Sequence, residues 1–241
     1  MKALKISSLI ILVIVLLIAL AVSYIKIFLP NTGPASDVKI ESTPQRIERG
    51  KYLANHVTLC VDCHSTRDWT LYAAPMQTDS LGGGGEAFTH DFEMPGTFYA
   101  RNISQAKLGT WTDGEILRAV TTGVDKNGKA LFPLMGYLRY GKMDQEDIYS
   151  IIAYIKTLPP VQREIPAPDF DFPVNILLNT MPHKAAFSKR PDENDKVKYG
   201  GYMVNAAGCV ECHSRREKGE IVPGSEFGGG MQFKMPGGVT T

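Results

Sequence analysis

The most hydrophobic part of the chain lies near its N-terminus. Leu9–Val22 is an unbroken run of 14 apolar residues, preceded by Lys2 and Lys5. A helix over residues 6–25, with a rise of about 1.5 Å per residue, is long enough to cross the roughly 30 Å hydrocarbon core of a bilayer. The two lysines predict a cytoplasmic N-terminus and export of the rest of the chain.

The same run is also compatible with a cleaved signal peptide. Ala19-Leu20-Ala21 has the small-x-small form that a signal peptidase accepts. This triplet lies inside the apolar run rather than after it, which favours a retained anchor. Both interpretations place the remainder of the chain outside the cytoplasm.

Three later segments show the period of an amphipathic helix. The first covers residues 47–57 and ends shortly before Cys60. The second begins at the capping box Thr112–Glu115, and the third is capped by Asp144. This third helix carries isoleucines at i, i+3, i+4 and i+7, starting from Ile148. These patterns predict an all-α unit with long loops.

Part of the sequence is repeated. Arg49–Asn55 precedes one Cys-x-x-Cys-His motif, and the similar segment Tyr199–Asn205 precedes another. Further on, Phe92–Gly96 is echoed by Phe233–Gly237, each after a run of glycines. The same structural module therefore begins twice.

The patterns together predict five segments. We expect a transmembrane anchor at 1–30, a short linker at 31–43, a first domain at 44–160, a proline-rich linker at 161–194 and a truncated second domain at 195–241. The expected fold is all-α: an N-terminal transmembrane helix followed by two similar domains, the second of them incomplete.

Composition narrows the possible functions. The 26 Lys and Arg residues nearly balance 25 Asp and Glu, for a formal net charge of +1, which argues against a nucleic-acid-binding protein. A chain with 44% hydrophobic and 21% charged residues is expected to fold. The sequence contains no pattern typical of a hydrolytic triad or of a paired-carboxylate site.

All four cysteines belong to the two Cys-x-x-Cys-His motifs, which are the attachment sequence for c-type haem. Two thiols on one turn can each add to a haem vinyl group, and the next residue, histidine, can bind the iron. The predicted attachment residues are Cys60 and Cys63 with His64 in the first motif, and Cys209 and Cys212 with His213 in the second.

Two other uses of such cysteine pairs fit less well. Zinc sites also use Cys-x-x-Cys pairs, but 145 residues lie between Cys63 and Cys209, and both pairs carry the adjacent histidine. A thioredoxin-like dithiol would be expected in a βαβ pattern, which surrounds neither motif.

A second axial ligand determines what each haem can do. The best candidate in the first module is Met135, which follows His64 by 71 residues and lies on a loop before the final helix. Ligation by His and Met suits electron transfer. His90 is one alternative, and Met94, which recurs as Met235, is another.

From about Arg46 onward, the chain resembles the membrane-bound multihaem cytochrome c subunits of periplasmic alcohol, gluconate and aldehyde dehydrogenases. The resemblance rests on Arg49–Leu53, Asn102–Ser104, Trp111, Asp125–Gly128, Pro133-x-Met135 and Tyr154 with Pro159-Pro160. It implies class I cytochrome c-like domains, two covalently bound haem c groups and Met135 as the distal ligand of the first. The sequence departs from the family pattern at Gly136, where proline is usual, and at Ser104, where threonine is usual.

The second module is short beside the first. Only 28 residues follow His213, and the repeat stops where the first copy would enter Asn102–Ser104. We therefore expect the chain to be a fragment of a longer one. Otherwise the second iron has an open face or takes a ligand from a partner.

These observations predict a dihaem electron carrier, not an enzyme, anchored in the bacterial inner membrane with its haem domains in the periplasm. Its expected partners are the membrane and redox proteins: a dehydrogenase or quinol as donor and a respiratory acceptor. One alternative is a dihaem peroxidase-like enzyme with an open second haem. Another is a fixed subunit of a respiratory complex.

Overall fold

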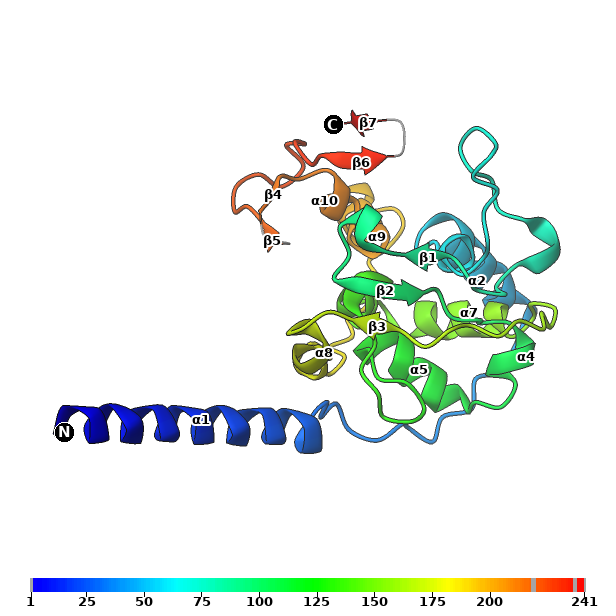
Figure 1. Ribbon diagram of the computed structural model, residues 1–241. Coiled ribbons are helices and arrows are strands. Elements are labelled where there is room, and N and C mark those ends of the chain that lie inside the picture. The colour runs from blue at the N-terminus through cyan, green and yellow to red at the C-terminus, as the bar shows by residue number, and fades with distance from the viewer. Residues whose placement is uncertain (1, 218–219, 236–237, 241) are drawn as a thin grey trace.

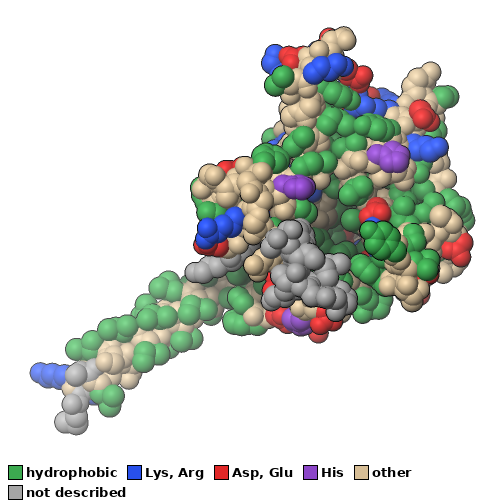
Figure 2. Space-filling model, turned by 90° about the horizontal axis from the view of Figure 1, so that it is seen from above, with side chains coloured by type: hydrophobic (Ala, Val, Ile, Leu, Met, Phe, Trp, Pro, Cys, Tyr) green, Lys and Arg blue, Asp and Glu red, His purple; other side chains and the backbone are tan. Residues whose placement is uncertain are grey.

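The computed structural model describes residues 2–217, 220–235 and 238–240, and within α1 and the last two strands some side chains are also left out. Helix α1 (Lys2–Phe28) leaves the body of the molecule as a single rod of apolar side chains (Figures 1 and 2). Among the described residues, one helix is long and apolar enough to cross a membrane, and its apolar window is not buried by the rest of the chain.

The core of the first domain forms where α2 (Pro44–His56) crosses α7 (Gln145–Ile155). The two backbones touch at Gly50, since a Cβ atom placed there would lie 1.8 Å from the Ser150 carbonyl oxygen. Leu53 from α2 and Ile152 from α7 are fully buried at this crossing. Glycine is therefore required at position 50 for this close approach.

The capping residues that the sequence predicted are present. Thr112 and Glu115 form a reciprocal capping box at the start of α5 (Asp113–Thr122), and Gly123 ends this helix with a φ of 78°. The Asp144 carboxylate accepts a hydrogen bond from the Glu146 N–H at 2.8 Å at the start of α7.

The fold is mainly helical, but short antiparallel strands add to the predicted all-α architecture. β1 (Ala87–Phe88), β2 (Gly96–Tyr99) and β3 (Asp169–Phe170) form one sheet. Two further hairpins pair β4 (Arg216–Glu217) with β5 (Glu220–Ile221), and β6 (Phe233–Met235) with β7 (Gly238–Thr240). Strands of two to four residues are too short to show an alternating pattern in sequence.

Several short helices complete the described chain. They are α3 (Cys60–Cys63), α4 (Gln105–Leu108), α6 (Tyr137–Tyr140), α8 (Val174–Leu177), α9 (Lys196–Ala207) and α10 (Cys209–Cys212), with 3-10 turns η1 (Thr78–Ser80), η2 (His90–Phe92), η3 (Pro133–Met135) and η4 (Leu178–Thr180).

The two segments expected as linkers both pack on the first domain. In segment 31–43, Ile40 is buried and its N–H donates to the Asp113 carboxylate at 2.7 Å. In segment 161–194, β3 pairs with β2 and thereby extends the small sheet. Both segments are therefore part of the folded body.

Candidate functional site

The first Cys-x-x-Cys-His motif forms one helical turn and its cap. α3 begins at Cys60 and ends at Cys63, and the N–H of His64 donates to the Cys60 carbonyl at 2.9 Å. Leu59, just before this turn, has a φ of 53°, in the left-handed region. Residues three apart on a helix share a face, so both cysteines lie on one side of the turn that His64 ends.

The His64 ring is fixed by a hydrogen bond through Nδ1. This atom lies 2.6 Å from the Arg101 carbonyl oxygen, which can only accept, so Nδ1 carries the proton. Nε2 is then the atom with a free lone pair, the form in which histidine binds a metal. Burial lowers the pKa of His64, against the opposing effect of this hydrogen bond, which favours the neutral ring.

Both cysteine thiols of this motif have a raised pKa. Burial raises the pKa of Cys60 to about 11, although the contact with Thr58, at 3.1 Å from the sulfur, acts in the other direction. Burial, with the nearby Asp62 charge, also raises the pKa of Cys63. Thioredoxin-type dithiols depend on a lowered pKa, so this environment does not favour dithiol redox chemistry.

The second motif repeats the geometry of the first. α10 spans Cys209–Cys212, and the N–H of His213 donates to the Cys209 carbonyl at 3.0 Å. Gly208 precedes this turn with a φ of 70°, so it takes the left-handed position that Leu59 has in the first copy.

The glycine-rich loops close on the two histidines in the same way. The His64 carbonyl accepts a hydrogen bond from the Gly84 N–H at 2.7 Å, and the His213 carbonyl accepts one from the Gly229 N–H at 2.8 Å. The repeated glycine runs are therefore loops folded back over each motif.

A buried serine after each histidine was missed by the sequence analysis. The Ser65 hydroxyl accepts from the Gly82 N–H at 2.9 Å, and the Ser214 hydroxyl accepts from the Phe227 N–H at 3.1 Å. Both serines are fully buried. Their shared position after the motif was a usable signal, because serine follows the histidine in both copies.

Met135 lies at the end of η3, and the next helix ties this turn to the first motif. The Tyr140 hydroxyl of α6 donates to the Thr58 carbonyl at 2.9 Å, and Thr58 contacts the sulfur of Cys60. Gly136, which links η3 to α6, has a φ of 68°. This left-handed conformation suits glycine and is closed to proline.

Tyr137, two residues after Met135, is fully buried. Within the described part of the chain its hydroxyl has no hydrogen-bond partner, and burial raises the pKa of Tyr137 to about 12. An unpaired buried donor is costly unless an acceptor is supplied.

The other candidates for a distal iron ligand are His90, Met94 and Met235. The His90 Nε2 atom lies 2.8 Å from a carboxylate oxygen of Asp171, and both side chains are largely exposed. Met94 is half-buried just before β2. The side chain of Met235 lies outside the described residues, as do Pro236 and Gly237 of the predicted repeat.

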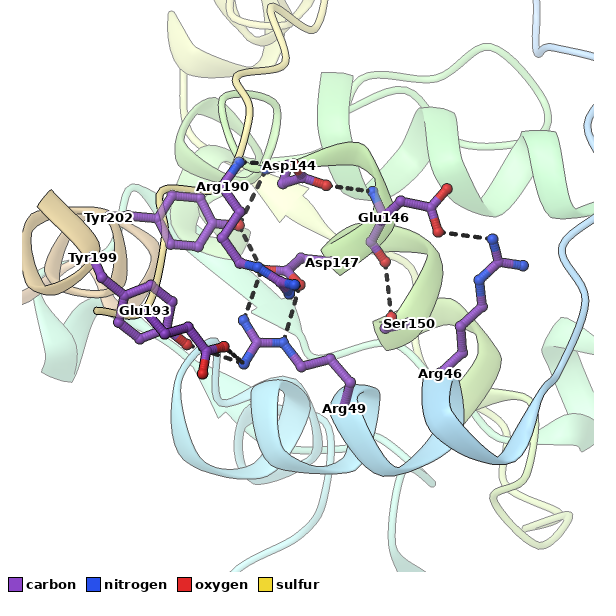
Figure 3. Close-up of polar contacts among 10 residues, drawn as sticks. All are labelled: Arg46, Arg49, Asp144, Glu146, Asp147, Ser150, Arg190, Glu193, Tyr199 and Tyr202. Carbon is purple, nitrogen blue, oxygen red and sulfur yellow. Dashed lines mark hydrogen bonds and ion pairs between the residues drawn. The ribbon is translucent and has the colours of Figure 1, made fainter. Parts of the chain in front are cut away.

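A buried carboxylate joins the first module to the second (Figure 3). Asp147 of α7 accepts two hydrogen bonds from Arg49 of α2, both at 3.0 Å, and one from Arg190 at 2.6 Å. The Tyr202 hydroxyl of α9 donates to the same carboxylate at 2.7 Å. Arg49 also donates to the Tyr199 hydroxyl at 3.1 Å. One side chain thus holds α2, α7, the proline-rich segment and α9.

The charge of this carboxylate is stabilised by its partners. Burial alone would raise the pKa of Asp147, but hydrogen bonds from Arg49 and Tyr202, with the Arg49 and Arg190 charges, hold that pKa below its usual range. Asp147 therefore stays ionised at neutral pH.

Arg139 makes a second connection between the modules. Its guanidinium forms an ion pair with Glu211 of α10 at 3.4 Å and lies over the Tyr140 ring at 5.8 Å. Within the described residues its Nε atom is buried and has no hydrogen-bond partner. Arg139 therefore spans from α6, which follows Met135, to the second Cys-x-x-Cys-His turn.

These side chains fit covalent haem. Each motif offers two thiols one turn apart and an adjacent imidazole, and in the first motif Nε2 is the free ring atom. The buried Tyr137 hydroxyl beside the Met135 turn has no hydrogen-bond partner among the described residues, as expected if a bound group supplies the acceptor. We infer from this donor set that both turns are suited to haem attachment.

Comparisons with known proteins point the same way. No family model matches the chain. The alcohol dehydrogenase (quinone) cytochrome c subunit of Gluconobacter oxydans is 27% identical over 79% of this chain and 40% of its own length. The gluconate 2-dehydrogenase cytochrome c subunit of Pantoea cypripedii is 30% identical over 70% of this chain and 38% of its own length.

The name of a third relative states that it is a dihaem protein. The diheme cytochrome c-type protein of Cereibacter sphaeroides is 30% identical over 65% of this chain and 53% of its own length. The chain thus spans about 40 to 50% of the length of these relatives. The resemblance predicted from the sequence motifs is confirmed: the chain is homologous to the cytochrome c subunits of alcohol and gluconate dehydrogenases and to a dihaem cytochrome c.

Proposed function

We propose that this chain is a membrane-anchored c-type cytochrome that transfers electrons and carries two covalently bound haem c groups. When bound, the haem iron supplies a one-electron Fe(III)/Fe(II) couple. The residues proposed to hold the two groups are Cys60, Cys63, His64 and Met135 for the first, and Cys209, Cys212 and His213 for the second.

In this proposal the protein residues orient the haem groups and shield them from water. The Arg101 carbonyl fixes the tautomer of His64 and increases the basicity of its Nε2 atom. The glycine-rich loops, held by the His64 and His213 carbonyls, would cover one edge of each group and limit access of water. Such hydrogen bonding and burial are the features by which proteins adjust haem potentials.

The proposed domains follow the sequence boundaries. Residues 44–160 and 195–241 would be class I cytochrome c-like haem domains, joined by 161–194 and preceded by the anchor at 1–30 and the linker at 31–43. The close crossing of α2 and α7 at Gly50 supports one compact domain between residues 44 and 160.

The proposed location is the periplasmic side of the bacterial inner membrane. Support comes from the apolar helix α1 with lysines at its N-terminal end. The proposed donor is a dehydrogenase subunit or a quinol, because relatives of this chain are cytochrome subunits of dehydrogenases. The proposed acceptor is a component of the respiratory chain.

The observation that carries the proposal is the repeated geometry of the two motifs. Each is a single turn entered from a left-handed residue, and in each the histidine carbonyl and the next serine hydroxyl accept hydrogen bonds from the returning loop. Two unrelated cysteine pairs would have no reason to share these contacts.

The test is covalent haem attachment. We expect the chain, produced in bacteria with a cytochrome c maturation system, to retain haem after denaturing electrophoresis and to gain the mass of two haem groups. Replacing Cys60 and Cys63 by alanine, or Cys209 and Cys212, should each remove one group. A chain of unmodified mass would overturn the proposal.

A further inference from the structure

A short segment of the body lies against the end of the apolar helix. α8 and η4 contact α1, and the Asn179 side-chain amide donates to the Ile25 carbonyl at 3.5 Å. Figure 1 shows α8 beside the C-terminal end of α1. If α1 spans a bilayer, as the proposed function requires, this segment lies at the level of the lipid headgroups.

This segment exposes two large apolar side chains. Phe172, just before α8, is 78% exposed, and Leu177 at the end of α8 is 43% exposed. Ile27 and Phe28, at the end of α1 that contacts α8 and η4, are 72% and 62% exposed. Aromatic and leucine side chains at this depth are typical of residues inserted into a membrane interface.

A basic recess lies beside the same segment. It has a volume of about 370 Å³ and lies between the end of α1, the loop at 128–130 and η4. The residues used here are two lysines, Lys26 and Lys129, and four apolar side chains, Leu29, Pro30, Phe170 and Leu178. Lysines beside apolar walls at a membrane surface match a phospholipid, which joins an anionic phosphate to acyl chains.

Three acidic side chains lie near the recess. Asp171 pairs with His90, Asp169 lies in β3 with an exposed side chain, and the Asp125 carboxylate accepts a hydrogen bond from the Lys129 N–H at 2.8 Å. None of these carboxylates lines the recess. The charge of the recess itself is therefore positive.

We propose that residues 170–181, with Lys26 and Lys129, form a second membrane contact that binds anionic phospholipid in the leaflet where α1 emerges. This inference rests on the anchoring part of the proposed function. Its effect is to hold the body of the protein on the membrane surface at a fixed height.

The test uses the full chain in lipid nanodiscs that contain a diazirine-labelled phosphatidylglycerol, with cross-linked peptides located by mass spectrometry. We expect cross-links in α1 and also in residues 170–181. Cross-links in α1 alone would overturn the proposal. Cross-links in residues 170–181 that are as abundant with labelled phosphatidylcholine would also overturn it, because the anionic headgroup would have no role.

Two variants test the role of the positive charge. Lys129→Gln should reduce phosphatidylglycerol cross-linking at residues 170–181 by about fivefold. The matched control is Lys126→Gln on the same loop, whose ammonium donates to the Thr110 hydroxyl at 3.1 Å; it should leave the yield unchanged. Equal losses in both variants would count against a specific site.

Failure of this inference is distinguishable from failure of the proposed function. Loss of cross-links from both α1 and residues 170–181 would overturn the anchor as well as the second contact. Haem attachment is measured on denatured protein and does not depend on either result.

Discussion

The guanidinium of Arg139 lies directly against the backbone of Gly208. A Cβ atom placed on Gly208 would lie 2.6 Å from Arg139 Cζ, and one placed on Gly136 would lie 2.6 Å from Arg139 Nη2. The same guanidinium therefore contacts both the residue that follows Met135 and the residue that opens the second motif. Two glycines, each in the left-handed region, leave room for it.

Replacing Gly208 by alanine should disturb the second motif. The φ of 70° costs an L-residue about 1–2 kcal/mol, and the new methyl group would collide with Arg139. We expect the free energy of unfolding to fall by at least that amount, as measured by chemical denaturation. The control is Gly201→Ala. A Cβ atom at Gly201 would have no neighbour within 4 Å, so this variant should keep or increase the stability of α9. Equal stability of the two variants would contradict the close contact.

Acid should weaken the connection made by Asp147. The pKa of this carboxylate is lower in the folded protein than in the unfolded chain. Its contribution is therefore complete above the ordinary aspartate pKa of about 3.9 and is lost as pH falls through the lowered folded value. We expect the wild-type protein to lose stability below about pH 4 more steeply than Asp147→Asn, as followed by thermal melting against pH. Parallel pH profiles would show that Asp147 is not the responsible group.

At neutral pH, Asp147→Asn should be destabilising. It removes the charge shared by Arg49 and Arg190. Glu193 still lies 3.9 Å from Arg49, and the Arg190 side chain is 38% exposed, so we expect a cost below the roughly 3–5 kcal/mol typical of breaking a fully buried pair. Glu146→Gln on the same helix is the matched control, because its carboxylate is 63% exposed and pairs with Arg46 at the surface. We expect a change within about 1 kcal/mol for the control.

The distal ligand can be assigned by comparing two methionines. Met135→Leu should abolish the spectroscopic signature of methionine–iron bonding at the first haem and allow carbon monoxide to bind the reduced protein there. Met94→Leu should retain the signature. If the two results are exchanged, Met94 is the ligand and the proposed role of Met135 is wrong.

Removing one hydroxyl should loosen the link between α6 and the first motif. Tyr140→Phe deletes the hydrogen bond to the buried Thr58 carbonyl and leaves that acceptor unpaired, at an expected cost of about 1–3 kcal/mol. Tyr149→Phe is the control, since the Tyr149 hydroxyl accepts from Gln145 at the surface. Denaturation midpoints that shift equally would argue against a special role for Tyr140.

Local features of this fold could be predicted from the sequence. The Thr112 cap, the Asp144 cap and the apolar N-terminal helix each depend on residues within one or two turns, and all are present in the structure. The two Cys-x-x-Cys-His turns were also located by spacing alone. Their roles in binding haem stay predictions.

Contacts between residues far apart in the sequence could not be predicted from the sequence. Arg49 was noticed only as part of a repeated motif, and its partner Asp147 lies 98 positions later. Arg139 belongs to no recognisable sequence motif. Its contacts with Gly136 and Gly208 form only when the chain folds. The strand pairing of segment 161–194 and the burial of Ile40 depend likewise on surfaces that exist only after the helices pack.

The contact between Gly50 and Ser150 also bears on how the protein matures. In the proposed function the chain is exported from its N-terminus, so α2 and the thiols of Cys60 and Cys63 would reach the periplasm before α7. Until then Gly50 faces no partner and the first motif lies on an open chain. A haem-ligating enzyme would therefore meet both thiols on an unpacked chain, and the arrival of α7 would then complete the core against α2.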